Sequence, residues 1–420
     1  MTKVVVAAAL SLAAACARPD YGDCAFSCAA SAACPGELEC VAGWCRAGGE
    51  TASCGAGEDI DASNVVTGTD ATQSCWEYAP SNFDSCALPA SIGDWLVEGN
   101  DAVFDTSDVT VEGVAPPSMT VVRQDDGSEV VLVIAGAIHV APDKRIIARG
   151  RRPLLIVALG DVYLEGTVDV SSAGAQVGAG SSKCDDDGGQ GGGGDVGPVA
   201  VDQPGAGGGG GGGFGSPGGA GGTGGCGDTE NDGVCDSDGG SAGAAGAQAS
   251  SLTLRPLRGG CVGGLGGGLP AGTGGPGGGA VQISTQRLLR IETEIMAGGG
   301  AGLSSDTDRA GGGGGGSGGA ILLEGVDVEL LPGTALCANG GGGGGVDAVN
   351  PSDDAMCSIA PAHGAQRGGD GAVEGIAAGD GLGEIIRAGG GGGGGGVGRI
   401  VVRALHLTDQ EAISTPAYAE

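Results

Sequence analysis

The sequence predicts an all-β fold, a glycine-rich parallel β-helix or solenoid preceded by a small disulfide-rich module. Of the 420 residues 97 are Gly and only 3% are aromatic, which is unlike the core of a large globular domain. Short runs of alternating hydrophobicity recur between polyglycine tracts, as in residues 311–345. Cysteines gather near the N-terminus. Recurring units too short to bury their own apolar face are typical of a solenoid.

Changes in composition divide the chain into five segments. The predicted segments are a signal peptide at 1–15, a Cys-rich module at 16–55, a disulfide-containing connector at 56–100, a Gly-rich β-solenoid at 101–407 and a C-terminal tail at 408–420.

An early cation, Lys3, and an apolar run from Val4 to Ala15 indicate a secretory signal too short to span a membrane as a helix. The sequence LAAAC resembles the bacterial lipoprotein box, although Ala13 stands where that family has Leu. The resemblance implies lipidation of Cys16 and a membrane anchor, with Ala17 typical of sorting to the outer membrane. The alternative is cleavage after Ala17 and free secretion. Either route removes one of fifteen cysteines and leaves fourteen for pairing.

Six cysteines in residues 24–54 indicate a disulfide-stabilised module in an oxidising compartment. The segment CPGELECVAGWC resembles EGF-like elements, and its connectivity stays open. Zinc is disfavoured because C-x-x-C pairs and nearby His are absent from this segment. The candidates for disulfide bonds are Cys24, Cys28, Cys34, Cys40, Cys45, Cys54, Cys75, Cys86, Cys226, Cys235, Cys337 and Cys357.

Beyond residue 101, Val, Ile and Leu occupy alternate positions, as half-buried strands require. Val162 and Leu164 precede a Gly-Thr pair, and Val168 and Val170 follow it. Similar runs at 280–300 and 320–338 would stack in parallel, forming aliphatic ladders about 4.8 Å apart. The pattern over roughly 101–407 resembles the pectin-lyase-like right-handed β-helix. The whole layout is similar to glycine-rich surface lipoproteins of predatory gliding bacteria, which implies a location more than a chemistry.

The glycine tracts at 207–213, 311–316, 340–345 and 389–396 have two interpretations. They are flexible loops that leave the solenoid, or extended segments with three residues per turn that pack side by side. Only Gly permits the close backbone approach of the second arrangement.

The net charge of −32 and the absence of a basic stripe argue against a nucleic-acid partner. One basic cluster stands out: Lys144, Arg145, Arg149, Arg151 and Arg152. It either neutralises neighbouring acids between coils, the favoured interpretation, or contacts acidic polysaccharide or phosphate.

One loop, 228–240, has alternating acids followed by Gly, a spacing that resembles the first half of an EF-hand-type calcium loop. It lacks the acidic residue at position twelve, where Gly239 stands. The alternative is a solvated acidic excursion. The candidate calcium ligands are Asp228, Glu230, Asp232, Asp236 and Asp238.

No catalytic motif can be assigned. The match of GGSGG around Ser317 to a nucleophile elbow follows from composition, because it lacks a strand-turn-helix context. His139, His363 and His406 are far apart in sequence. We therefore expect a non-catalytic structural or adhesive protein of the cell surface, with a stiff stalk and polysaccharide or envelope proteins as partners. The alternatives are a polysaccharide-active β-helix enzyme, a lyase or hydrolase, and a calcium-dependent glycan-binding module.

Overall fold

The computed structural model describes residues 38–41, 44–47, 75–174, 176–181, 184, 189–195, 204–249, 253–346, 351–384 and 386–420. The chain divides into two compact units, Met1–Thr72 and Gln73–Glu420. In the first unit, strands β1 (Leu38–Val41) and β2 (Trp44–Ala47) pair antiparallel. The predicted signal peptide lies outside the described residues, as does most of the cysteine module.

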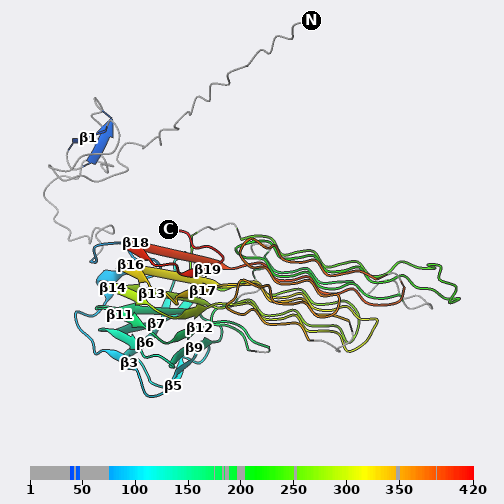
Figure 1. Cartoon of the computed structure of the whole chain (residues 1–420), viewed down its shortest axis with the longest axis horizontal. Helices are drawn as coiled ribbons and strands as arrows, with labels where there is room; N and C mark the ends of the chain where they lie inside the picture. The colour runs from blue at the N-terminus through cyan, green and yellow to red at the C-terminus, as the bar shows by residue number, and fades with distance from the viewer. Residues whose placement is uncertain are drawn as a thin grey trace, which may run out of the picture. The chain divides into compact units, whose positions relative to one another are not determined.

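In the described part of the second unit, strands form two sheets next to one another (Figure 1). The ten-stranded sheet has the order β3 (Trp95–Val97), β8 (Ile138–Val140), β11 (Val162–Leu164), β14 (Leu288–Ile291), β16 (Ala320–Leu330), β13 (Ala280–Thr285), β10 (Leu154–Ala158), β7 (Glu129–Ala135) and β6 (Ser118–Arg123), with β18 (Arg399–Asp409) also on β16. The seven-stranded sheet has the order β19 (Ile413–Thr415), β17 (Ala335–Cys337), β15 (Glu294–Met296), β12 (Thr167–Asp169), β9 (Arg145–Arg149), β4 (Ala102–Asp105) and β5 (Thr110–Gly113).

The prediction of a single parallel β-helix from 101 to 407 is wrong. The larger sheet is curled and mixed, because β6 pairs antiparallel with β7, and β4 and β5 make a second antiparallel pair in the smaller sheet. The long segments between strands also leave the sheets instead of continuing as coils. The fold is nevertheless almost entirely β: a 3-10 turn, η1 (Ser85–Ala87), is the sole helical element in the part described. No helix there is long and apolar enough to cross a membrane.

Parallel pairing places aliphatic residues in ladders, as their spacing predicts. Val162 pairs with Ile138 on one side and with Leu289 on the other. In the smaller sheet Val168 pairs with Ile146 and Ile295. These side chains are buried in one core cluster contributed by both sheets. The core therefore lies between the sheets and is filled mainly by aliphatic contacts.

The outer face of the larger sheet is covered over strands β7, β10, β13 and β16. Trp76 packs against Val130 and Leu155 there, in a cluster formed by the segment that follows Cys75. A second cluster places Phe214 against Leu322. Strands buried on both faces are near-continuous apolar runs, as in LLIVA of β10.

The glycine tracts are ordered and pack side by side. In tract 207–213, the amide of Gly208 donates to Gly222 O, and three residues later Gly211 donates to Gly219 O of the same neighbour, both at 2.8 Å. The intervening amides donate to two other segments. A three-residue period without internal hydrogen bonds is that of an extended polyproline-II helix. The interpretation of these tracts as flexible loops is therefore wrong.

Pure glycine marks the centre of this bundle, which continues from the sheets in Figure 1. Tract 205–213 is hydrogen-bonded to six described segments, 189–195, 219–225, 240–246, 264–267, 309–315 and 390–396. A Cβ atom at Gly211 would lie 1.8 Å from the carbonyl oxygen of Gly394. Segments at the periphery carry larger residues that point outward, such as Leu265, which is 60% exposed. Glycine content thus follows the number of neighbours of each segment.

Candidate functional site

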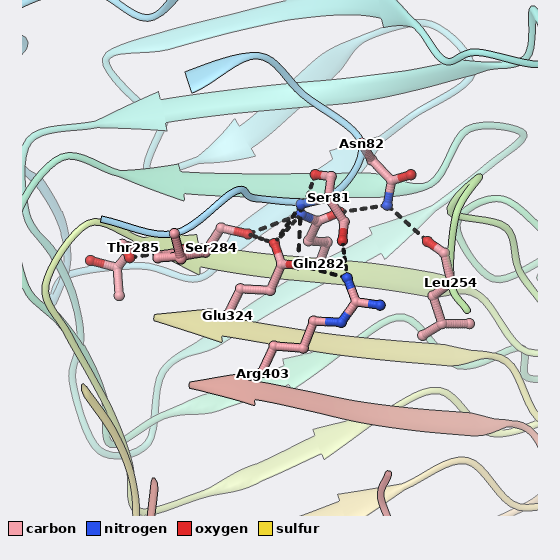
Figure 2. A network of polar contacts seen from close by, with 9 residues as sticks. Ser81, Asn82, Leu254, Gln282, Ser284, Thr285, Glu324 and Arg403 are labelled. Carbon is pink, nitrogen blue, oxygen red and sulfur yellow. Dashed lines mark hydrogen bonds and ion pairs between the residues drawn. The ribbon is translucent and has the colours of Figure 1, made fainter. Parts of the chain in front are cut away.

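A buried carboxylate, Glu324 on β16, is the centre of the polar network drawn in Figure 2. The backbone amide of Ser81 donates to its two oxygens at 3.1 and 3.0 Å. The side chains of Gln282 and Ser284 each donate to Oε2 at 2.9 Å. Arg403 Nη1 lies 3.7 Å from Oε1. Because Glu324 is fully buried and surrounded by donors, it is a structural acceptor rather than an accessible acid or base.

The same network fastens the segment after Cys75 to the sheet. The hydroxyl of Tyr78 donates to Thr285 O at 2.9 Å. Burial, followed by the negative charge of Glu324, raises the pKa of Tyr78, so the phenol keeps its proton and continues to donate. Asn82 Nδ2 donates to Leu254 O at 2.8 Å. These contacts join residues 172 to 243 positions apart in the chain.

The other half of the larger sheet carries polar side chains on its outer face. Leu96, His139, Tyr163 and Arg290 are partners in register across four adjacent strands. Glu329 and Thr408 continue the row on β16 and β18. The inward residues beside them, such as Val140 and Leu164, are buried. Period-two alternation therefore leaves one accessible row of mixed charge.

His139 lies between two carboxylates. Its Nε2 atom is 2.9 Å from Glu165, and its Nδ1 atom is 3.2 Å from Glu98. The hydrogen bond to Glu165 raises the pKa of His139; burial opposes this shift, and the hydrogen bond to Glu98 adds to it. Both ring nitrogens are occupied by carboxylates, so this imidazole is not positioned to activate a hydroxyl or thiol nucleophile. When it is protonated, this imidazole links β8 to the residues that follow β3 and β11.

A small pocket of about 140 Å³ adjoins this row. It is lined by Tyr163, Leu164, Glu165, Arg290 and Glu292. Tyr163 is 38% exposed and offers an aromatic face. Arg290 Nε is held 2.9 Å from Glu292. An aromatic surface beside paired donors and acceptors can bind a hydroxylated ligand.

The predicted calcium loop uses its acids internally. Asp228 is buried and accepts from the amide of Gly233 at 3.1 Å. Asp236 accepts from the amide of Thr229 at 2.5 Å, which lowers its pKa. Asp232 accepts from the amide of Val234 at 2.9 Å. Glu230 and Asp238 complete the predicted set.

Calcium binding at this loop remains a prediction without support from its geometry. Across the described residues, no group of three or more His, Cys, Asp or Glu is placed to hold a metal. The local hydrogen bonds instead fit a self-capped turn.

The basic cluster neutralises acids, as the favoured interpretation predicts. Arg145 and Arg149 both contact Asp169 Oδ2, at 3.0 and 2.8 Å. Arg152, in the link between β9 and β10, pairs with Glu129 at the start of β7 at 2.8 Å. Arg151 does not take part in these ion pairs, and its side chain is exposed.

Four disulfide bonds occur in the described residues. The predicted candidates form Cys75–Cys86, Cys226–Cys235 and Cys337–Cys357. Cys184–Cys261 was absent from the candidates, although these two remain once Cys16 and the other twelve cysteines are set aside. The signal was that fourteen cysteines remain without Cys16, one pair more than the twelve candidates. Cys16, Cys24, Cys28, Cys34 and Cys54 lie outside the described residues, and so do the side chains of Cys40 and Cys45.

The other residues considered in the sequence analysis, Ser317 and two histidines, do not come together in a catalytic site. Ser317 is fully buried in the bundle, where its Oγ accepts from the amide of Cys261 at 2.8 Å, so GGSGG is no nucleophile elbow. His363 lies 3.7 Å from Asp370, and His406 lies 3.0 Å from Asp327.

Glu324 was missed from the sequence. Its signal was a carboxylate inside the apolar run AILLEG, at a position where the outer face of the strand is covered. Comparison with known proteins gives no family model, no curated protein and no solved structure that matches the chain. A proposal for function therefore rests on the residues and their arrangement alone.

Proposed function

We propose that this protein is an exported structural or adhesive protein of the cell surface, in which the glycine bundle is a stiff projecting element. The observation that supports the proposal is the interlocked bundle, whose central tracts are hydrogen-bonded to neighbours on every side. Stiffness follows because the amides of the central tracts are hydrogen-bonded to adjacent segments and the packed backbones leave no room for a side chain. A catalytic constellation is unnecessary for this role.

Export is supported by the cysteines. Four disulfide bonds in the second unit fit an oxidising compartment. The proposal includes a lipid anchor at Cys16, which would hold the protein at the outer membrane, with free secretion as the alternative. Its partners would be polysaccharide or other envelope proteins.

The test uses the full mature chain without lipid, mixed with insoluble and soluble polysaccharides and with cell envelopes. Depletion of the protein from solution without new polysaccharide ends supports an adhesive role. A variant with Gly314→Ala and Gly211→Ala, which disrupts the bundle centre, should lose extended shape in small-angle scattering. Retention of that shape would contradict the proposed stalk.

A second candidate function is action on polysaccharide at the sheet face. One observation favours it: the Tyr163 pocket carries an accessible aromatic ring beside Glu165 and Glu292. Appearance of new chain ends that depends on Glu165 would select this function over the structural one. A Glu292→Gln variant provides the matched carboxylate change in the same pocket.

A further inference from the structure

A separate pocket of about 610 Å³ shares no lining residue with the Tyr163 pocket. Three links meet there: the β6–β7 turn at 126–129, the β9–β10 link at 151–153 and the segment 257–258. Its floor includes Gly180, where a Cβ atom would lie 2.5 Å from the ring of Pro153. This volume is within the range of small-ligand sites.

The walls of the pocket are fixed by buried hydrogen bonds. Gln124 Nε2 donates to Leu257 O at 2.9 Å, and the amide of Leu257 donates to Gln124 Oε1 at 2.7 Å. Arg152 donates to the carbonyl oxygens of Thr106 and Ser107, at 3.0 and 2.7 Å. A site held in this way needs little ordering when a ligand binds.

Its carboxylates are already engaged. Glu129 is paired with Arg152 at 2.8 Å. Asp126 accepts from the amide and the hydroxyl of Ser128, at 2.9 and 2.6 Å. Both therefore point to partners within the wall rather than to a ligand.

Arg151, a cation of the same pocket, is placed differently from these paired carboxylates. The guanidinium of Arg151 is exposed, and among the described residues no carboxylate lies within ion-pair distance of it. Arg258 lies with its guanidinium carbon 5.7 Å from the ring centroid of Phe214, a stacked position that orients its donors. Arg152 is paired with Glu129, so Arg151 is the arginine of this pocket whose guanidinium is both exposed and without a carboxylate partner among the described residues.

We propose that this pocket binds the anionic groups of an acidic polysaccharide, with Arg151 as the principal contact. The planar fork of Arg matches carboxylate and sulfate groups with two parallel hydrogen bonds. The open mouth suits a group carried on a polymer. Because the net charge of −32 repels polyanions in general, the attraction is confined to the arginines of the pocket. The inference rests on the proposed surface function for its ligand, but it assigns a site distinct from the Tyr163 face.

The test measures binding of the full mature chain to polygalacturonate and to dextran sulfate, with neutral dextran and inorganic phosphate as comparison probes. We expect Arg151→Gln to weaken binding of the acidic polymer about tenfold, the loss of one charged hydrogen-bonding partner. Arg287→Gln is the control with the same change of charge, because Arg287 is exposed and lies outside the pocket. Arg151→Glu should abolish binding, and thermal unfolding checks that each variant is folded.

Three outcomes would overturn the inference. They are equal binding by Arg151→Gln and the parent, equal binding of neutral dextran, and binding of inorganic phosphate alone. If the Arg151 variants were retained on cell envelopes as well as the parent protein, the pocket would be excluded as the binding site, but the adhesive function would still stand. Loss of all retention by the parent protein would contradict the adhesive function itself.

Discussion

At the scale of single residues, glycine in the bundle is required by contact distance. At Gly314 a Cβ atom would lie 2.0 Å from Gly210 O, inside a tract that has neighbours on every side. At Gly193, on the periphery, the nearest atom would be Leu265 O at 3.7 Å, an ordinary contact. The same residue type therefore has different tolerance according to position.

We predict that Gly314→Ala lowers the free energy of unfolding by about 3 kcal/mol, the upper end for overpacking into a rigid interior. Gly193→Ala should change it by less than about 0.5 kcal/mol, as at other unconstrained surface sites. Chemical denaturation of both variants measures the difference. Equal stabilities would show that the bundle is not close-packed.

Glu324 provides the second prediction at this scale. Glu324→Ala leaves the Ser81 amide and the Gln282 and Ser284 side chains without their common acceptor, in a fully buried site. Breaking a buried charged network of this kind costs about 3–5 kcal/mol. Glu329→Ala, on the same strand but partly exposed, is the control and should cost less than about 1 kcal/mol. Thermal and denaturant unfolding of the two variants measures both losses. A larger loss for Glu329→Ala than for Glu324→Ala would contradict the structural role of Glu324.

At the scale of elements, His139 joins three strands through charge. Protonated His139 interacts with Glu165 and Glu98, and its pKa is raised in the folded chain. The stabilisation is fully present below the ordinary pKa of 6.5 and is lost as pH rises through the higher folded value. The melting temperature of the parent should therefore exceed that of His139→Gln at about pH 5.5, and the gap should narrow by about pH 9.

The matched control for this prediction is His363→Gln, which removes an exposed imidazole that does not belong to the strand row. A gap between parent and His139→Gln that widens with pH would contradict the proposed linkage. Nuclear magnetic resonance titration of the His139 ring measures the direction of the pKa shift directly.

Disulfide bonds differ in the length of chain that they close. Cys184–Cys261 spans 77 residues, whereas Cys226–Cys235 spans 9. Loop entropy predicts stabilisation of about 4.5 and about 2.6 kcal/mol respectively. Replacing both cysteines of each pair by Ser, and measuring unfolding in denaturant, should rank the first loss above the second. The reverse ranking would show that local packing, rather than loop closure, determines the effect.

Much of this element structure was predictable, but its assembly was not. Alternation identified the strands, and the pairing of Val162 with Leu289 follows the predicted ladder. The antiparallel partner of β7 could not be inferred, because SMTVVR shows the same alternation whether its neighbour runs parallel or antiparallel. The aliphatic period records which face is buried and does not record strand direction. The single β-helix was wrong for this reason.

The candidate sites divide in the same way. The ion pairing of the arginines was the favoured interpretation, and the cysteines of three disulfide bonds were among the candidates from composition. The row from His139 to Arg290 required the register of strands that are up to 151 residues apart in the sequence. Acidic spacing alone suggested a calcium loop at Asp228, although the loop closes with its own amides. Short-range patterns identify such residues, but their partners depend on the fold.

At the scale of the whole second unit, the segments that form the bundle are the connections between strands of the two sheets. Segment 297–319 leaves β15, passes through the bundle and returns as β16, and segment 338–398 does the same between β17 and β18. Each central tract is therefore held at both ends by strands of the core. In the bundle the backbones are closely packed and their hydrogen bonds are buried, whereas local opening usually begins where backbone hydrogen bonds are exposed to solvent.

This continuity leads to the last prediction, that the bundle unfolds together with the sheets. Amide hydrogens in tracts 207–213, 311–316 and 389–396 should exchange as slowly as those of β7 and β10, although the tracts consist of glycine alone. Hydrogen exchange followed by mass spectrometry measures both sets in one sample. The exposed segment 229–236 is the internal control and should exchange faster than the tracts, because several of its amides bond to side-chain carboxylates of the same loop rather than to backbone of the bundle. If the tracts exchanged as fast as an unfolded peptide, the proposed stiff stalk would be contradicted. If they lost protection at a lower denaturant concentration than the strands, the bundle would be a separate unfolding unit.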